Sequence, residues 1–160
     1  MTSDETFERD PDNPLEYPDR LPTEPQELQQ TLLGPESECA GIEGFCLMGQ
    51  ISQLNLDFVI QPDLEAALIR TLVGAGDVSY AGLGTDRLGN AVEVFAVDDP
   101  DGQRQYLHLF DTRTGHYVGQ ETVLIRPQAD LEDIDVPAVI GFDTITDRAL
   151  IAPDELPPRR

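Results

Sequence analysis

Apolar runs separated by turn signals dominate the middle of the chain, from residue 78 to residue 125. Each turn signal combines aspartate, whose side chain hydrogen-bonds nearby backbone N–H groups, with glycine, which accepts a positive φ. We therefore predict an antiparallel meander of β-strands. Apolar side chains occupy both faces of its strands, which predicts a sheet covered on both sides at its centre. The predicted strands are Ala91–Val97, Arg104–Phe110 and His116–Ile125, and the turns are 86–90, 98–102 and 111–115.

The stretch before the meander predicts two more strands and one helix. Phe45–Met48 is a short apolar run, and in Leu54–Ile60 apolar and polar residues alternate with the period of a half-buried strand. This alternation predicts that Leu56 is buried and that Leu56→Asp prevents folding. After Pro62, leucines recur at four-residue spacing as far as Leu72. That spacing predicts an amphipathic helix of about eleven residues.

The N-terminal part of the chain differs in character from this core. Residues 1–22 are acidic and rich in proline, which predicts a disordered tail. Leu28 and Leu32 lie four residues apart, with Leu33 alongside, and predict a short amphipathic helix over Glu24–Leu33. We therefore predict an α+β fold: a small antiparallel sheet with one main packed helix, flanked by acidic, partly disordered tails. The predicted division is a tail (1–22), a helix and linker (23–44), an α+β core (45–126) and an extended C-terminal arm or edge hairpin (127–160).

Charge narrows the classes of partner. The chain holds 31 acidic residues and 10 basic ones, giving a formal net charge of −21, and every basic residue is arginine. Such a charge repels nucleic-acid phosphates and anionic membranes, so we expect no direct nucleic-acid binding and no membrane association. The lack of lysine excludes Schiff-base chemistry and a P-loop lysine. No apolar run is long enough for a membrane span and no signal-peptide pattern follows Met1, so we expect a cytoplasmic protein. Salt adaptation or a GC-rich genome would explain the composition as well as a functional role does.

Two histidines and two cysteines are the candidates for metal or redox chemistry. If residues 112–115 close a hairpin, His108 lies opposite Gly119 and points to the other face from His116; a bulge at Gly115 would shift this register. Six residues separate Cys39 from Cys46, which matches neither a redox C-x-x-C motif nor a zinc ribbon. We therefore predict two free thiols. We predict no catalytic, cofactor-binding or metal-binding residue, and no cofactor.

The function favoured by these patterns is a non-catalytic interaction or adaptor module that binds a protein partner, which the charge suggests is basic. Leu28, Leu32 and Leu33 would dock in a groove of the partner, and Leu15 and Tyr17 would form a second contact from the acidic tail. On this hypothesis, replacing Leu28 and Leu32 with alanine weakens partner binding and changes the melting temperature little. One alternative is a small ligand-binding domain or enzyme with a pocket between sheet and helix. A second is a nucleic-acid mimic, although the central segment is the least acidic per residue.

Overall fold

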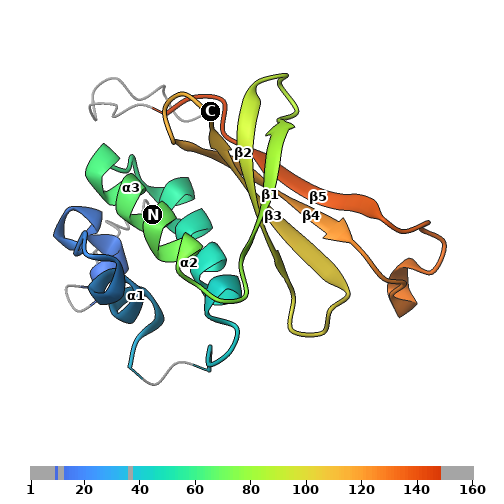
Figure 1. Ribbon diagram of the computed structural model, residues 1–160, viewed down its shortest axis with the longest axis horizontal. Coiled ribbons are helices and arrows are strands. Elements are labelled where there is room, and N and C mark those ends of the chain that lie inside the picture. Colours follow the sequence, from blue (N-terminus) through green and yellow to red (C-terminus); the bar gives the residue numbers. More distant parts are fainter. Residues whose placement is uncertain (1–9, 11–12, 36–37, 149–160) are drawn as a thin grey trace, which may run out of the picture.

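The computed structural model describes residue 10 and residues 13–35 and 38–148. Within them, three α-helices precede a five-stranded antiparallel sheet whose strands lie side by side in chain order (Figure 1). The predicted α+β fold with an antiparallel meander is confirmed, with three helices in place of one main helix. The helices are α1 (Pro25–Leu33), α2 (Glu43–Asp57) and α3 (Pro62–Val73). The strands are β1 (Ser79–Thr85), β2 (Ala91–Asp98), β3 (Arg104–Asp111), β4 (Tyr117–Leu124) and β5 (Ala138–Thr144).

The turns of the meander have the chemistry that the sequence indicates. Gly89, Gly102 and Gly115 take φ values of 87°, 64° and 73°, a region that glycine enters without strain. In the third turn, the Asp111 carboxylate accepts the backbone N–H groups of residues 113 and 114, both at 2.9 Å. These hydrogen bonds hold the pKa of Asp111 below its usual value. Local sequence therefore determines where the chain reverses.

Helix α2 replaces both strands predicted before the meander, and this is the main correction to the predicted fold. Its buried face includes Leu47, Ile51 and Leu54, spaced three or four residues apart, so a helical period underlies the apparent alternation. Leu56 falls on the opposite side of the helix and is 55% exposed, so its predicted burial is wrong. Consequently, Leu56→Asp would not place a carboxylate in the core.

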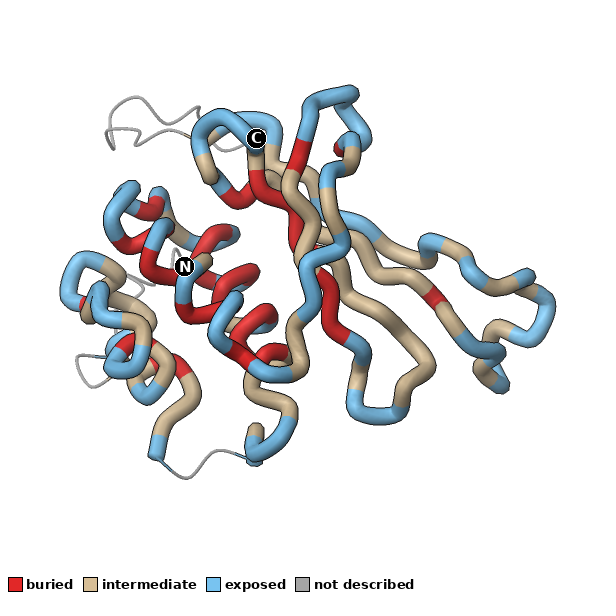
Figure 2. Tube along the Cα trace, in the orientation of Figure 1, coloured by how far each residue is buried: buried red, intermediate tan, exposed pale blue. Residues whose placement is uncertain are grey.

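The core lies between the helices and one face of the sheet. Figure 2 shows buried positions concentrated on the helices and on the strand segments next to them. Leu28 of α1 is 0% exposed and Leu32 is 5% exposed, so α1 forms part of this core. Leu21 is also buried, and the described part of the predicted tail forms two short 3-10 helices, Pro14–Glu16 and Pro18–Arg20. The structured region thus begins before the predicted boundary at residue 22; residues 1–9, 11–12, 36–37 and 149–160 lie outside the described chain.

The two faces of the sheet differ in their cover. Val97 and Phe110 pack into the core with the helices. Val92, Ala96 and Leu109 are buried as well but lie outside that cluster, on the opposite face by strand alternation. The three α-helices all lie on the first face (Figure 1). Buried side chains therefore occur on both faces of the sheet, as predicted for its centre, but the three α-helices cover only one of these faces.

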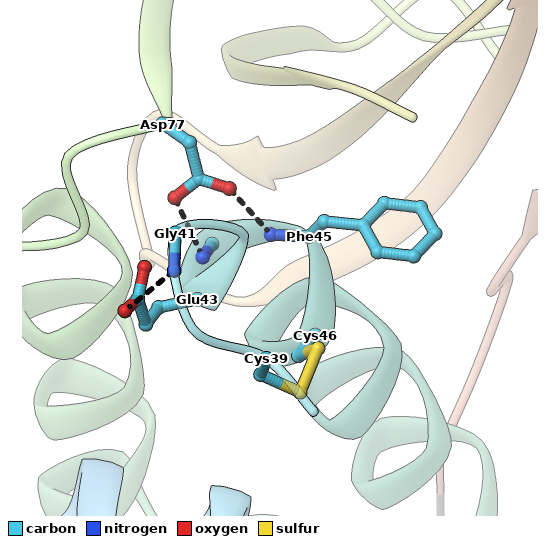
Figure 3. Close-up of a disulfide and its surroundings, with 7 residues drawn as sticks. Cys39, Gly41, Glu43, Phe45, Cys46 and Asp77 are labelled. Carbon is cyan, nitrogen blue, oxygen red and sulfur yellow. Dashed lines mark hydrogen bonds between the residues drawn. A yellow bond between two sulfur atoms is a disulfide. The ribbon is translucent and has the colours of Figure 1, made fainter. Parts of the chain in front are cut away.

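The two cysteines form a disulfide, Cys39–Cys46, which corrects the prediction of free thiols (Figure 3). The first turn of α2 brings residue 46 back to the loop that precedes the helix, a proximity that the linear spacing does not reveal. Disulfides persist mainly in oxidising compartments, so the disulfide gives no support to the predicted cytoplasmic location. In the part of the chain that the structure describes, no helix has the length and apolarity to cross a membrane.

Candidate functional site

A cavity of about 410 Å³ lies between helix α2 and strands β3 and β4. The described residues that line it are all uncharged, in a protein whose net charge is −21. Helix α2 contributes Phe45, Cys46, Met48, Gly49, Ser52, Gln53 and Leu56; β3 contributes Tyr106 and His108; and β4 contributes Gln120. A concave, mainly apolar surface with a few polar groups is the usual form of a small-molecule site.

Two periodicities produce this lining. On α2, residues 45, 48, 52 and 56 recur every three or four positions and form one stripe of the helix. On β3, Tyr106 and His108 are two residues apart and share a face. Gln120 lies directly opposite His108 on β4. The cavity is therefore formed where the stripe of the helix crosses the core-facing side of the sheet.

His108 is the most deeply buried polar group in the cavity wall, at 1% exposure. Its ring is hydrogen-bonded to the Gln120 side chain, and the amide nitrogen of Gln120 donates to the Asp143 carboxylate at 2.8 Å. That bond raises the pKa of the ring, the direction expected when the imidazole donates and the Gln120 oxygen accepts. Nδ1 of His108 has no hydrogen-bond partner among the described residues, so the bond to Gln120 is made by Nε2–H. With the proton on Nε2, Nδ1 presents a buried lone pair.

Burial lowers the pKa of His108 from 6.5 to about 3, because the apolar surroundings disfavour the imidazolium, while the hydrogen bond to Gln120 acts in the opposite direction. His108 is consequently neutral near pH 7. A neutral imidazole with its Nε2 proton held by Gln120 can act at Nδ1 only as a hydrogen-bond acceptor.

The low pKa of His108 predicts a pH dependence of stability. The unfolded chain binds a proton on this histidine near pH 6.5, whereas the folded chain does so only near pH 3. Its contribution to stability is therefore intact above pH 6.5 and is lost as pH falls towards 3. Between pH 7 and pH 5 we expect the wild type to lose roughly 2 kcal/mol more unfolding free energy than His108→Leu. Urea denaturation at both pH values measures this difference, with His116→Gln as the control for the other histidine. Equal losses in wild type and His108→Leu would contradict the assignment.

Ser52 provides the complementary donor in the same wall. The buried Tyr117 hydroxyl donates to Ser52 Oγ at 3.2 Å, which leaves the Ser52 proton available for another acceptor. Burial raises the pKa of Tyr117 to about 12, so the phenol keeps its proton. The Tyr117 ring also packs edge-on against His108, with the ring centroids 5.1 Å apart. Tyr117 thus contacts both Ser52 and His108.

Comparison with protein-family models, with curated proteins and with solved structures found no match. The chemistry of the site must therefore be argued from the residues themselves.

A second polar cluster joins α3 to the third turn of the sheet. Glu65, 3% exposed, accepts the backbone N–H of Tyr117 at 2.7 Å and contacts Nδ1 of His116 with its other oxygen. Arg148 donates to Asn55 Oδ1 and to the Tyr117 carbonyl, both at 2.8 Å. These groups border a hollow of about 320 Å³ that His116 and Arg148 help to line. The cluster joins helix α3, the start of β4 and the C-terminal segment.

No group of three or more potential metal ligands occurs among the described residues.

The residues predicted to bind a partner lie elsewhere. Leu28 and Leu32 are buried in the core, and Leu33 and Leu15 are partly buried against it. The Arg20 guanidinium lies over the ring of Tyr17, 4.3 Å from the ring centroid. None of the five lines the cavity between α2 and the sheet. In this fold Leu28 and Leu32 are not accessible to a partner.

Sequence reasoning offered a pocket between sheet and helix as an alternative but named no residue of it, because it assigned α2 as strands and placed His108 opposite Gly119. The structure has a bulge between Leu109 and Phe110 of the β3–β4 ladder, so His108 pairs with Gln120. The one usable signal was the placement of Tyr106, His108 and Phe110 on a common strand face, where a lone polar ring lies between two aromatic ones.

Proposed function

We propose that this protein binds a small, uncharged and mainly apolar molecule that carries a hydrogen-bond donor, in the cavity between α2 and the sheet. The observation that carries the proposal is the Nδ1 atom of His108: a buried acceptor, without a partner in the described chain, in a wall of uncharged residues. The proposal concerns binding and assigns no chemical step.

The energetics favour a donor-bearing ligand. A buried acceptor left without a hydrogen bond costs about 1–3 kcal/mol, and a ligand hydroxyl or amine that reaches Nδ1 recovers part of that cost. Ser52 can donate a second hydrogen bond to the same ligand, because its own oxygen already accepts from Tyr117. The apolar surfaces of Phe45, Met48 and Leu56 would contact the rest of the molecule.

Size and charge restrict the class further. The volume of about 410 Å³ lies in the range of small-molecule sites, and suits a ligand of one or two rings. A charged ligand would lose its hydration without gaining a counter-charge in the lining, and an anion would also be repelled by the net charge of −21. These restrictions favour neutral aromatic or alicyclic alcohols and aromatic amines.

The ligand-binding alternative drawn from the sequence thus becomes the preferred function. Binding of a basic protein partner and mimicry of nucleic acid stay predictions. The predicted partner interface depended mainly on Leu28 and Leu32, and both are buried in the core, where a partner cannot contact them.

The test uses three related probes: 1-naphthol, which is neutral with one donor; 1-methoxynaphthalene, which lacks the donor; and 1-naphthoate, which is an anion. Isothermal titration is expected to show 1-naphthol binding about tenfold more tightly than the ether, since one buried hydrogen bond is worth about 1–1.5 kcal/mol, and no binding of the anion. His108→Leu should remove the difference between naphthol and ether.

His116→Gln is the matched control, because His116 lies outside this cavity, and it should leave the preference for naphthol unchanged. Equal affinity for naphthol and ether in the wild type, or naphthol binding that is indifferent to His108→Leu, would contradict recognition at Nδ1. Failure of 1-naphthol and of 1-methoxynaphthalene to bind would contradict the site itself.

A further inference from the structure

We propose that the Cys39–Cys46 disulfide is a reversible oxidation site that controls ligand access to the cavity between α2 and the sheet. The proposal rests on the proposed ligand-binding function, because its effect is exerted on the same cavity. The connection is direct: Cys46 is one of the residues that line the cavity, and Cys39 belongs to the loop before α2 (Figure 3).

Helix α2 is the element whose position matters most for the cavity. It supplies most of the described lining residues, and four of them, Phe45, Cys46, Met48 and Gly49, come from its first two turns. The ring of Phe45 packs edge-on against Tyr106 on the opposite wall, with the centroids 5.5 Å apart. Any loosening of the start of α2 therefore changes the cavity wall.

One side of the start of α2 is held without the disulfide. The Asp77 carboxylate accepts the backbone N–H groups of Gly44 at 2.7 Å and Phe45 at 3.1 Å, which caps the helix N-terminus (Figure 3). A Cβ atom at Gly44 would clash with Val78 and Asp77, so α2 approaches the segment between α3 and β1 closely at this point. This side stays fixed when the disulfide opens.

The other side depends on the disulfide. Three hydrogen bonds and one covalent bond hold the described part of the loop before α2. The Gly41 N–H donates to Glu43 Oε1 at 3.0 Å, the Ile42 N–H to the Cys39 carbonyl at 3.0 Å and the Cys46 N–H to the Ile42 carbonyl at 3.1 Å, and the disulfide joins Cys39 to Cys46. The hydrogen bonds join residues two to four positions apart, and the bond from Gly41 to Glu43 is exposed to water. Reduction therefore removes the covalent constraint that keeps Cys39 beside the first turn of the helix.

A reductant can reach the disulfide. Both cysteines are only partly buried, and Cys39 also lines a separate hollow of about 370 Å³ beside α1. The co-reactant is a dithiol. Its first thiolate attacks Sγ of Cys39, forms a mixed disulfide and expels Cys46 as a thiolate, which takes up a proton. Its second thiol then attacks the mixed disulfide, releases Cys39 as a thiol and leaves the reductant as a disulfide. Two electrons and two protons pass from the dithiol to the protein.

The two chemical states should differ in ligand affinity. In the oxidised protein Phe45 and Cys46 are held in the cavity wall; in the reduced protein the loop before them regains conformational freedom that a ligand must remove again. We expect 1-naphthol to bind about three- to tenfold more weakly to the reduced protein. This loss is smaller than the full entropic effect of closing the short ring between Cys39 and Cys46, because only part of the regained freedom affects the cavity. Reciprocity then requires that bound 1-naphthol make reduction less favourable by the same factor.

The experiment compares oxidised wild type, wild type reduced with dithiothreitol, and Cys39→Ser. This variant cannot form the disulfide and keeps every described lining residue of the cavity, so it should bind 1-naphthol like the reduced wild type and ignore dithiothreitol. Ala40→Ser is the matched control in the same loop and should respond to dithiothreitol as the wild type does. If the oxidised protein binds 1-naphthol and the other two samples bind it with the same affinity as the oxidised protein, the disulfide does not regulate the cavity. The proposed ligand-binding function would then still stand.

A second measurement does not require a ligand. Hydrogen exchange of wild-type amides, followed by mass spectrometry with and without dithiothreitol, should show faster exchange in residues 43–49 on reduction, while α3 is unchanged. Unchanged exchange in 43–49 would overturn the proposal even if no naphthalene probe bound. Faster exchange in 43–49 supports it, and a lack of probe binding would then count against the proposed function alone.

Discussion

Replacing Leu28 and Leu32 together with alanine is expected to lower the free energy of unfolding by about 5 kcal/mol, because each buried leucine truncated to alanine costs roughly 2–5 kcal/mol. Leu28 is 0% exposed and Leu32 is 5% exposed, both in the cluster that α1 shares with α2 and α3. A loss of this size approaches the whole stability of a small domain, about 5–15 kcal/mol. Urea denaturation of the double variant measures it, and this result would reverse the expectation drawn from the sequence.

The matched control is Gln29→Ala with Gln30→Ala on the same helix, where neither side chain is fully buried. That variant should change the unfolding free energy by less than about 1 kcal/mol, since surface changes in a helix are small. If the leucine variant were as stable as the glutamine variant, α1 would not belong to the core, and its leucines would again be available for a partner.

Glu65→Ala is expected to lower the free energy of unfolding by about 3 kcal/mol. The buried Glu65 carboxylate accepts the Tyr117 N–H and contacts His116, so its removal leaves a buried donor without an acceptor. It also removes a negative charge that favours the protonated form of the partly buried Arg148. The loss should appear as a lower denaturation midpoint together with faster hydrogen exchange at Tyr117.

Glu65→Gln separates the hydrogen bond from the charge. The glutamine oxygen can still accept the Tyr117 N–H, so this variant should retain a good part of the stability that Glu65→Ala loses. Asp63→Ala, on the exposed side of the same helix, should have little effect. Equal stability of Glu65→Ala and wild type would show that the cluster of Glu65, His116 and Arg148 does not tie α3 to the sheet.

The meander was predictable because its determinants are local. Each reversal contains an aspartate that hydrogen-bonds the turn backbone and a glycine with a positive φ, and residues a few positions apart decide both. Helix α3 was predictable for the same reason: Pro62 opens it and leucines at four-residue spacing follow. The strand order β1 to β4 then follows from short hairpin connections, whereas residues 125–137 join β4 to β5.

Helix α2 was not predictable from the alternation of residues 54–60. Leu54 fits both a strand period and a helix period, and only packing against α1, α3 and the sheet selects the helical face that also holds Leu47 and Ile51. The assignment of strands also hid the lining of the cavity, because a strand over 45–48 cannot place Phe45 and Met48 opposite Tyr106. The sequence therefore offered a pocket between sheet and helix as an alternative without identifying the residues that line it.

The sequence alone determined the turns, the antiparallel sheet, two of the three α-helices and the acidic, lysine-free composition, because these depend on residues that are neighbours in the chain. The tertiary structure decided whether Leu28 faces a partner or the core, whether Cys39 and Cys46 are free, and whether His108 has a partner for Nδ1. These outcomes depend on which distant segments meet: α1 with α3, the loop before α2 with its first turn, and β3 with α2. Burial at those contacts decides the accessibility and hydrogen bonding of these side chains. The spacing of residues along the chain does not reveal which side chains become buried.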